Sequence, residues 1–178
     1  DLVHEQLWIA AGQPLSERVQ AASAAMADPT RHAIEMRVSA EDPARAFAPV
    51  PGTIGRWREP AGPGVRVDSG VEEGMVVSGD YDPLLSKILV VGTDRADAIR
   101  RARRAVDEME TGGLQTTLPF HAWLLRHPAF VAGDVRTDLV DRDWDPAPPR
   151  AAAARLAIDA VASYLGTNGM SISGPIGV

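Results

Sequence analysis

Cysteine is absent from the 178 residues, and lysine occurs only once, as Lys87 in the run SKILVV. Without cysteine, the chain has no disulfide bonds and no thiolate ligands for a metal ion. Lysines commonly contact nucleotide phosphates or carry covalently attached groups. Lys87 is therefore the one candidate for every such role on this chain.

Long apolar runs are also lacking. No stretch of about 18 hydrophobic residues occurs, so no segment is expected to span a bilayer. The first residues, DLVHEQLWIAAG, have neither the basic start nor the small-residue cleavage site of a signal peptide. The net charge of −6 argues against general nucleic-acid binding. We therefore expect a cytoplasmic protein with neither a membrane nor a nucleic acid as partner.

Several catalytic motifs are missing as well. The chain has no GxxxxGK[ST] phosphate-binding loop, no GxSxG nucleophile turn and no HExxH pair. The stretch GPGVRVDSG does not follow the GxGxxG pattern between a strand and a helix. The histidines lack the spacing of a metal site, and we expect no metal on this chain; they are His4, His32, His121 and His127.

Hydrophobic residues make up 45% of the sequence, enough for one domain with a buried core. Residues 1–12 have the apolar spacing of a helix that Gly12 closes. The chain opens at Asp1 already inside this pattern, which indicates a longer polypeptide that continues into this helix. Further along, HAIEMRV predicts a half-buried strand, short segments between 49 and 79 predict an antiparallel meander, and LLSKILVVG predicts a strand covered on both faces.

The clearest helix follows, and Thr93 or Asp94 can cap its start. Its arginines stand four positions from acidic residues, which predicts a solvated face neutralised within the helix. The expected pairs are Asp97–Arg101, Arg103–Asp107 and Arg104–Glu108. A second helix is predicted from Thr116 or Thr117 up to Pro128.

The end of the chain differs in composition from the rest. WDPAPPR, residues 144–150, is typical of a linker, and the alanine-rich segment after it predicts a helix before a glycine-rich end. With strands grouped in the first half and helices in the second, we expect an α+β fold, an antiparallel sheet with flanking helices. We place one domain at 1–148, and a helix with a flexible glycine-rich end or linker at 149–178.

One arginine lies in an unusual setting. In GPGVRVDSGV, residues 62–71, alternation would place Val65 and Val67 on one face of a strand and Arg66 and Asp68 on the other. The flanking glycines allow backbone or a ligand to come close. Such a segment holds the guanidinium in a fixed direction, either toward a ligand or in an ion pair with Asp68 or another carboxylate.

Five stretches carry a specific pattern through their order along the chain: DLVHEQLWIAAGQPLS, HAIEMRVSAEDP, PGTIGRWREPAGPGVRVDSGV, YDPLLSKILVVGTDRADAI and GGLQTTLPFHAWLLRHPAF. Together they resemble the carboxy-terminal domain of biotin carboxylase, which also occurs in the alpha chains of acyl-CoA carboxylases and in pyruvate carboxylase. The resemblance covers about residues 1–140. Five blocks in the same order are far more specific than a single short motif.

The resemblance implies a function and a set of partners. Enzymes of this family use ATP and magnesium to activate bicarbonate as carboxyphosphate, and then carboxylate a nitrogen of biotin on a separate carrier domain. Their ATP-grasp catalytic elements lie upstream of the DLVHEQL-like helix, so the chain alone is expected to be inactive toward ATP. The implied partners are an ATP-grasp part, a carboxyltransferase subunit, a biotin carboxyl carrier domain and a second copy in a homodimer.

The resemblance also implies two site residues. Arg66 matches the family's arginine that reaches the ureido oxygen of biotin, where a preorganised guanidinium would stabilise negative charge. The glycines around it would leave room for the biotin ring. Thr137, in FVAGDVRTDL, lies near a position that lines the adenine pocket in the family, with a helix cap as the alternative. No Met-Lys-Met-like tetrapeptide occurs, so biotin is expected on another domain.

Four further residues receive more modest expectations. Asp94 and Arg95, in GTDR, correspond to a region of homodimer contacts, whereas Asp82 and Lys87 are expected to have structural roles in a turn and a strand. Two hypotheses stay open at this point. The chain is either part of a biotin-dependent carboxylase that completes the biotin site, or a non-catalytic assembly or dimerisation module derived from that domain.

Overall fold

The computed structural model describes residues 2–26 and 31–148, together with positions 150, 151, 154, 155, 157, 158 and 161. The helices are α1 (Leu2–Ala10), α2 (Glu17–Ala25), the 3-10 helix η1 (Pro43–Arg45), α3 (Arg95–Glu108), α4 (Leu118–Leu124), α5 (Pro128–Ala132) and α6 (Leu139–Asp143). The strands are β1 (His32–Ser39), β2 (Glu41–Asp42), β3 (Ala48–Pro49), β4 (Gly52–Thr53), β5 (Arg56–Arg58), β6 (Val65–Ser69), β7 (Val76–Val77), β8 (Leu84–Gly92) and β9 (Glu110–Gly112).

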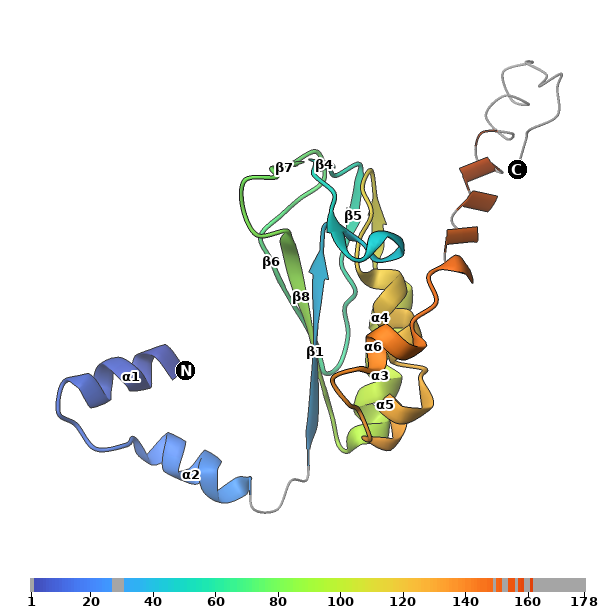
Figure 1. Cartoon of the computed structure of the whole chain (residues 1–178). Coiled ribbons are helices and arrows are strands. Elements are labelled where there is room, and N and C mark those ends of the chain that lie inside the picture. The colour runs from blue at the N-terminus through green and yellow to red at the C-terminus, as the bar shows by residue number, and fades with distance from the viewer. Residues whose placement is uncertain are drawn as a thin grey trace, which may run out of the picture.

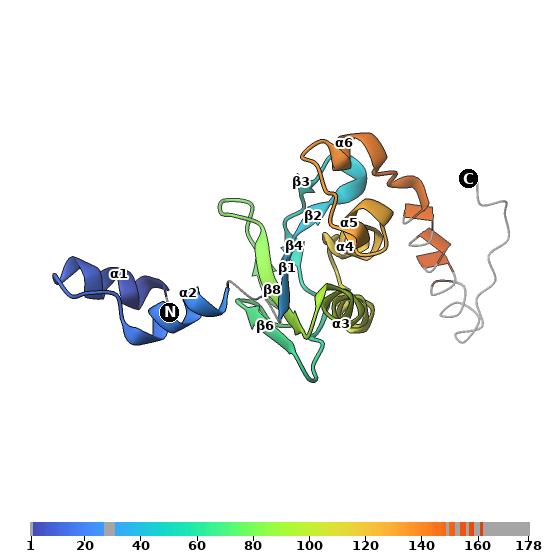
Figure 2. The ribbon, with the colours of Figure 1, turned by 90° about the horizontal axis from the view of Figure 1, so that it is seen from below.

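A three-stranded antiparallel sheet in the order β1-β8-β6 forms the centre of the fold (Figure 1). The strand β8 lies in the middle, so its backbone pairs on both edges. Helices flank this sheet (Figure 2). The predicted α+β fold with an antiparallel sheet is therefore confirmed.

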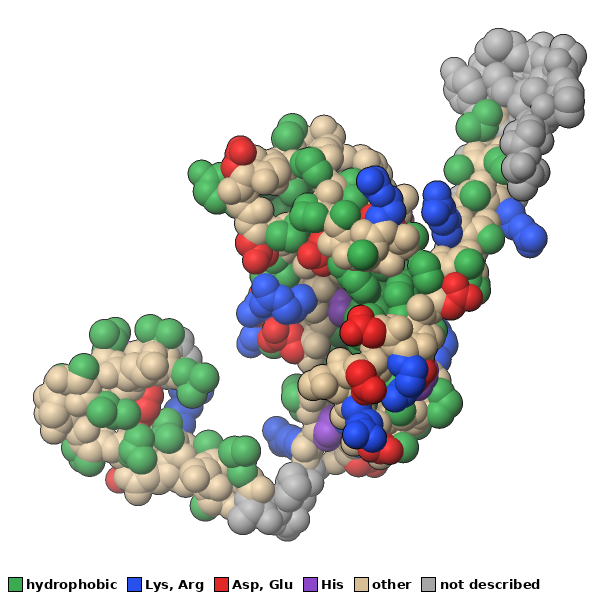
Figure 3. Space-filling view, in the orientation of Figure 1, with side chains coloured by type: hydrophobic (Ala, Val, Ile, Leu, Met, Phe, Trp, Pro, Cys, Tyr) green, Lys and Arg blue, Asp and Glu red, His purple; other side chains and the backbone are tan. Residues whose placement is uncertain are grey.

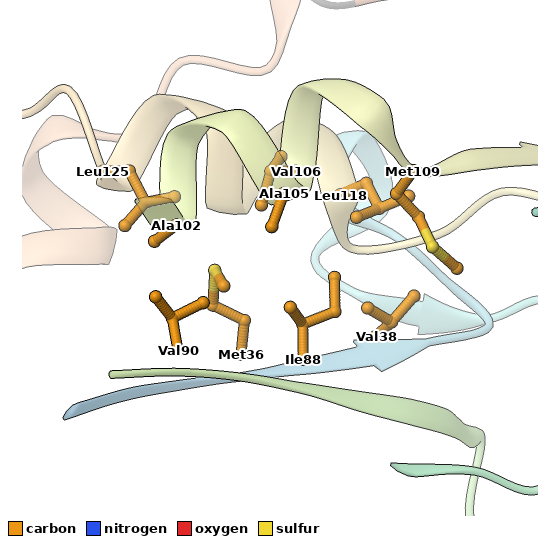
Figure 4. Packing of buried hydrophobic residues seen from close by; sticks show 10 residues of the cluster. All are labelled: Met36, Val38, Ile88, Val90, Ala102, Ala105, Val106, Met109, Leu118 and Leu125. Atoms are coloured by element: carbon orange, nitrogen blue, oxygen red, sulfur yellow. The ribbon is translucent and has the colours of Figure 1, made fainter. Parts of the chain in front are cut away.

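The core lies between this sheet and α3. Strand side chains alternate between the two faces, and the apolar set of β1 and β8 points toward the helix (Figure 4). Complete burial of one aliphatic side chain stabilises a fold by about 1.5–3 kcal/mol. Each of the ten cluster residues is at most 8% exposed: Met36, Val38, Ile88, Val90, Ala102, Ala105, Val106, Met109, Leu118 and Leu125.

The start of α3 is capped in both directions. The Asp94 side chain accepts a hydrogen bond from the Asp97 backbone N–H at 2.7 Å, and the Asp97 side chain accepts one from the Thr93 N–H at 3.0 Å. Asp97 also pairs with Arg101 at 3.0 Å, as predicted. These contacts satisfy the donors that a helix start leaves free.

The predicted pair Arg103–Asp107 is wrong, and Arg104–Glu108 does not occur among the ion pairs of the described residues. Arg103 donates instead to the Leu125 carbonyl at 3.0 and 2.8 Å, and Asp107 pairs with Arg126 at 2.7 Å. These polar groups therefore tie α3 to α4 and the residues after it, because the packing of the two helices offers closer partners than the same helix does.

The short strands between 48 and 77 do not form the predicted meander. In the described chain, β4 pairs with β7, β5 with β9 and β6 with β8. Local sequence indicates extended backbone, but the partner is set by distant contacts. The strand β8 is also more open than predicted, since Val91 is 43% exposed.

The prediction that the second helix runs up to Pro128 is only partly correct. The helix α4 ends at Leu124, and Pro128 begins α5. Proline is tolerated at the first helical position because its missing N–H has no partner there anyway.

An aromatic cluster joins α4 to Trp144, the C-cap of α6. Trp144, expected to begin a linker, packs edge-on against Trp123 with ring centroids 5.2 Å apart, and its Nε1 donates to the Pro43 carbonyl at 3.1 Å. Contact with the domain thus continues through this residue. The described positions from 150 to 161 are helical as predicted, and the glycine-rich end lies outside the described residues. The boundary at 148 stays a prediction.

The helices α1 and α2 form a hairpin that stands apart from the sheet (Figures 1 and 2). Glu5 holds the hairpin by accepting hydrogen bonds from the Ser16 N–H at 2.7 Å and the Ser16 hydroxyl at 2.8 Å, and these bonds lower the pKa of Glu5. Gly12 turns the chain after α1 with φ +78°, as expected. Apolar side chains gather on the hairpin surface (Figure 3), including exposed Leu2, Val3, Leu7, Trp8 and Ile9.

Among the described helices, none combines the length and apolar character needed to cross a membrane.

Candidate functional site around Arg66

Arg66 lies on β6 and points away from the core. Val65 and Val67 pack against the core cluster, so alternation directs Arg66 and Asp68 to the opposite face of the sheet. That arrangement matches the sequence prediction for this strand. The guanidinium therefore stands on the face of the sheet that α3 does not cover.

Two rows of side chains cross this face from strand to strand. One row is Arg66, Leu89 and Glu35, and the other is Asp68, Lys87 and Arg37. Opposite positions on antiparallel strands bring their Cβ atoms within about 4.5–5.5 Å. We call these six residues the open face. Basic and acidic side chains lie close together over this part of the molecule (Figure 3).

The guanidinium of Arg66 is engaged on one side only. Its Nη2 donates to Asp68 Oδ2 at 3.0 Å, with side chains 68% and 40% exposed, and Lys87 Nζ lies 3.9 Å from the same oxygen. Such surface ion pairs contribute about 0–1 kcal/mol. A guanidinium has five N–H donors. The Arg66–Asp68 ion pair that the sequence offers as an alternative is present, and it orients Arg66 while leaving donors for a ligand oxygen.

The glycines before β6 make room for protein atoms. Gly64 has φ +75°, and a Cβ there would overlap the Arg101 guanidinium and come within 2.5 Å of the Val91 carbonyl oxygen. A Cβ on Gly62 would lie 3.0 Å from Arg104 Nη2. Our expectation that the glycines leave room for a biotin ring is therefore wrong at these two positions, because α3 fills the space.

Thr137 is not brought to the open face. It is exposed in the turn before α6, on the helix side of the sheet, whereas Arg66 points from the other side. The N-cap of α6 is Asp138, so the helix-cap alternative for Thr137 is wrong by one residue. A role of Thr137 in an adenine pocket stays a prediction.

The acidic residue of YDPLLSK has the local role predicted for it. Asp82 accepts a hydrogen bond from the Leu84 N–H at 2.8 Å and so fixes the turn into β8. The side chain of Lys87 lies on the open face, on β8 and directly opposite Asp68 of β6. Sequence alternation in SKILVV could have placed Lys87 outward, but the strand that pairs with it is not readable from one sequence.

Asp94 and Arg95 make contacts within the domain. Asp94 caps α3, as described above, and Arg95 lies over the Phe130 ring at 5.0 Å, bonds the Phe130 carbonyl, and has Nη1 2.9 Å from His32 Nε2. These contacts give both residues a local structural role. Their part in a homodimer stays a prediction.

The described residues do not fit a magnesium site, since no group of three or more His, Asp or Glu side chains among them could hold a metal ion. Arg66 does fit a neutral or negatively charged oxygen such as that of a ureido group, because its exposed donors are permanently charged. A biotin role for Arg66 stays a prediction at this point.

A family model described as the biotin carboxylase C-terminal domain matches residues 35–142. The biotin-dependent acyl-coenzyme A carboxylase alpha3 subunit of Mycobacterium leprae is 42% identical over 149 residues, which is 82% of this chain and 24% of the relative. The biotin carboxylase of a Nostoc species is 42% identical over 140 residues, 79% of this chain and 30% of the relative. The chain thus spans less than a third of the length of these relatives.

Solved structures agree with this match. The biotin carboxylase domain dimer of Hydrogenobacter thermophilus 2-oxoglutarate carboxylase, in complex with MgADP, ADP and bicarbonate, has a TM-score of 0.60 and 34% identity over 61% of this chain and 24% of that one. The biotin carboxylase subunit of a pyruvate carboxylase has a TM-score of 0.60 and 33% identity, again over 61% of this chain and 24% of that one. This chain belongs to the biotin carboxylase C-terminal domain family.

Proposed function

We propose that the chain is the carboxy-terminal part of an ATP-dependent biotin carboxylase and that it supplies Arg66 to the site where carrier-bound biotin is carboxylated with bicarbonate. The observation that carries this proposal is an exposed guanidinium, oriented by Asp68 on the open face, in a chain of this family. The enzyme would be a ligase of the acyl-CoA or pyruvate carboxylase type.

Biotin supplies the nitrogen that takes up the carboxyl group. Arg66 would donate hydrogen bonds to the ureido oxygen of bound biotin and would stabilise negative charge on that oxygen. A guanidinium is a positively charged donor, so it can act on an oxygen without transferring a proton. Asp68 accepts from Nη2 and limits the rotation of the planar group. A donor placed before the reaction is worth more than one that must reorganise, and losing one costs about 10²–10³ in rate.

The remaining chemistry is assigned to partners. ATP and magnesium would act on an ATP-grasp part, biotin would arrive on a carrier domain, and a carboxyltransferase would use the product. A homodimer and a cytoplasmic location belong to the same proposal. The exposed apolar surface of α1 and α2 supports a covering partner, because burying it would contribute about 25 cal/mol per Å².

The test joins the chain to an ATP-grasp part from a relative and measures biotin carboxylation by wild type and by Arg66→Lys. Lysine keeps the charge but loses the planar fork, so we expect a loss of at least about 10² in rate. The KM for ATP and the melting temperature should stay unchanged. Arg100→Lys is the matched control, since Arg100 is also 68% exposed and paired with one aspartate, Asp97, at 2.8 Å.

Two results would count against the proposal. Near-normal carboxylation by folded Arg66→Lys enzyme would remove Arg66 from the mechanism. The second result concerns the wild-type chain in an assembly whose ATP-grasp part is known to be active with another carboxy-terminal domain. If the wild-type chain binds its partners there but supports no bicarbonate-dependent ATP cleavage, the chain is a non-catalytic assembly module instead.

A further inference from the structure

The loop that leads into β6, residues 62–64, has an unusual conformation. Gly62 has φ +122° and Gly64 has φ +75°, both in the region that favours glycine. The Val65 N–H donates to the Gly62 carbonyl at 3.1 Å, which closes a tight turn immediately before the strand. The Val91 N–H donates to the Gly64 carbonyl at 2.8 Å, which ties the loop to β8. The first residues of β6 thus take their position from this loop.

An arginine of α3 holds the same loop. Arg101 Nη1 donates to the Pro63 carbonyl at 2.9 Å, and its guanidinium occupies the space where a side chain on Gly64 would begin. Pro63 is only three residues before Arg66 in the chain. The hydrogen bond from α3 therefore fixes the backbone just ahead of the strand that presents Arg66.

Arg101 is itself held in place. Its Nε lies 3.0 Å from Asp97 Oδ2, and Asp97 is a buried carboxylate, 8% exposed, that also accepts from the Thr93 N–H at 3.0 Å. The fork of a guanidinium can contact a carboxylate on one edge and a carbonyl on another. A continuous series of polar contacts thus runs from the end of β8, through Asp97 and Arg101, to the loop before Arg66.

We propose that Arg101 is a positioning residue for Arg66: by holding the Pro63 carbonyl and filling the space beside Gly64, it sets the direction from which Arg66 meets the oxygen of biotin. This inference rests on the proposed function of Arg66. Arg101 does not touch the ligand in this proposal. It acts through the backbone of the loop and the first residues of β6, whereas the spacing along α3 predicts only its ion pair with Asp97.

The first arm of the test needs no activity. In the full chain, Arg101→Ala should speed hydrogen exchange at the Val65 and Val91 amides, which donate to the loop, while the global melting temperature changes little. Arg104→Ala is the matched control: Arg104 lies beside Gly62, but among the described contacts it donates no hydrogen bond to the loop. Unchanged exchange at both amides in Arg101→Ala would overturn the proposal.

The second arm uses the chain joined to an active ATP-grasp part. Small misplacements of a reacting group can cost up to about 10² in rate, so Arg101→Ala should lose about 10-fold to 10²-fold in biotin carboxylation with an unchanged KM for ATP. Arg101→Lys, which keeps one donor for Pro63, should recover part of this loss. Arg66→Ala combined with Arg101→Ala should be no slower than Arg66→Ala alone, because the second residue acts through the first.

The outcomes separate the two ideas. If Arg66→Ala slows the enzyme and the double variant is slower by the full product of the two single effects, Arg101 acts independently and the positioning role is wrong. If Arg66→Ala retains full activity, the proposed function of Arg66 fails, and the positioning role falls with it even if the exchange arm shows that Arg101 holds the loop.

Discussion

The two faces of the β1-β8-β6 sheet differ in their role: one packs in the core, and the other carries the candidate site. On one face, Ile88 and Val90 are fully buried against α3. On the other, their neighbours Lys87 and Leu89 are half-buried beside Arg66 and Asp68. Period-two alternation separates the two sets completely. The core residues and the candidate site thus lie on opposite faces of one sheet.

This comparison shows why the open face tolerates charge. Its ion pairs are solvated and contribute little energy, so its side chains can be chosen for what they present to a ligand. The loop before β6 differs from the open face, because Arg101 of α3 donates a hydrogen bond to it. Through this contact, a helix on the core face of the sheet influences a residue on the open face.

The comparison is tested most directly by neighbouring substitutions in β8. Ile88→Ala removes a fully buried side chain from the core, and we expect the free energy of unfolding to fall by about 2–5 kcal/mol. Lys87→Ala, on the open face, should cost no more than about 1 kcal/mol. Chemical denaturation of both variants measures the difference. Equal losses would mean that the open face is as tightly packed in solution as the core.

The loop before β6 can be tested with two glycines that share a positive φ. Gly64→Ala should cost about 1–2 kcal/mol for its backbone conformation, and a further 1–3 kcal/mol or so because the Val91 carbonyl and Arg101 occupy the space. Gly74→Ala, with φ +89° and no atom within 4 Å of its new Cβ, should show only the first cost. Equal melting temperatures for the two variants would contradict the close contact at Gly64.

A smaller effect is expected from pH. The hydrogen bond from Thr93, followed by that from Arg101, lowers the pKa of Asp97 below its ordinary value. Since the folded-state pKa is the lower one, the stabilisation is complete above the ordinary carboxyl pKa and is lost as the pH falls through the folded-state value. Asp97→Asn should flatten the dependence of the melting temperature on pH in this acidic window.

Asp107→Asn, which removes an exposed carboxylate of the same helix, controls for the loss of one negative charge in that experiment. An acid slope that Asp97→Asn leaves as steep as in wild type would show that Asp97 does not link α3 to the loop energetically.

Much of the structure on the core face of the sheet, including α3, could be predicted from the sequence. The Asp94 cap of α3, its Asp97–Arg101 ion pair and the alternation in β1 and β6 are local patterns, and each is found in the structure. Strand partners could not be predicted. For example, β5 pairs with β9 across more than fifty residues, and the sequence of neither strand indicates which strand it pairs with. The partners of Arg103 and Asp107 were missed for the same reason.

The candidate site divides in the same way. The outward direction of Arg66 follows from alternation in VRVDS, and its ion pair with Asp68 follows from the spacing of two. The placement of Lys87 beside that pair depends on the register of β6 with β8. Contact between Arg101 and the loop at Pro63 joins segments 38 positions apart, and no local pattern indicates it.

The packing of Trp123 against Trp144 gives this domain a built-in optical signal. The two indole rings lie 5.2 Å apart between centroids and are tilted by 69°, one from α4 and the other from the C-cap of α6. The electronic transitions of two indole rings couple when the rings lie this close together and are inclined to each other. The folded chain should therefore show a paired positive and negative band in its circular dichroism spectrum. Loss of that couplet would report detachment of α6 from α4 while the sheet, which contains neither tryptophan, keeps its own spectrum.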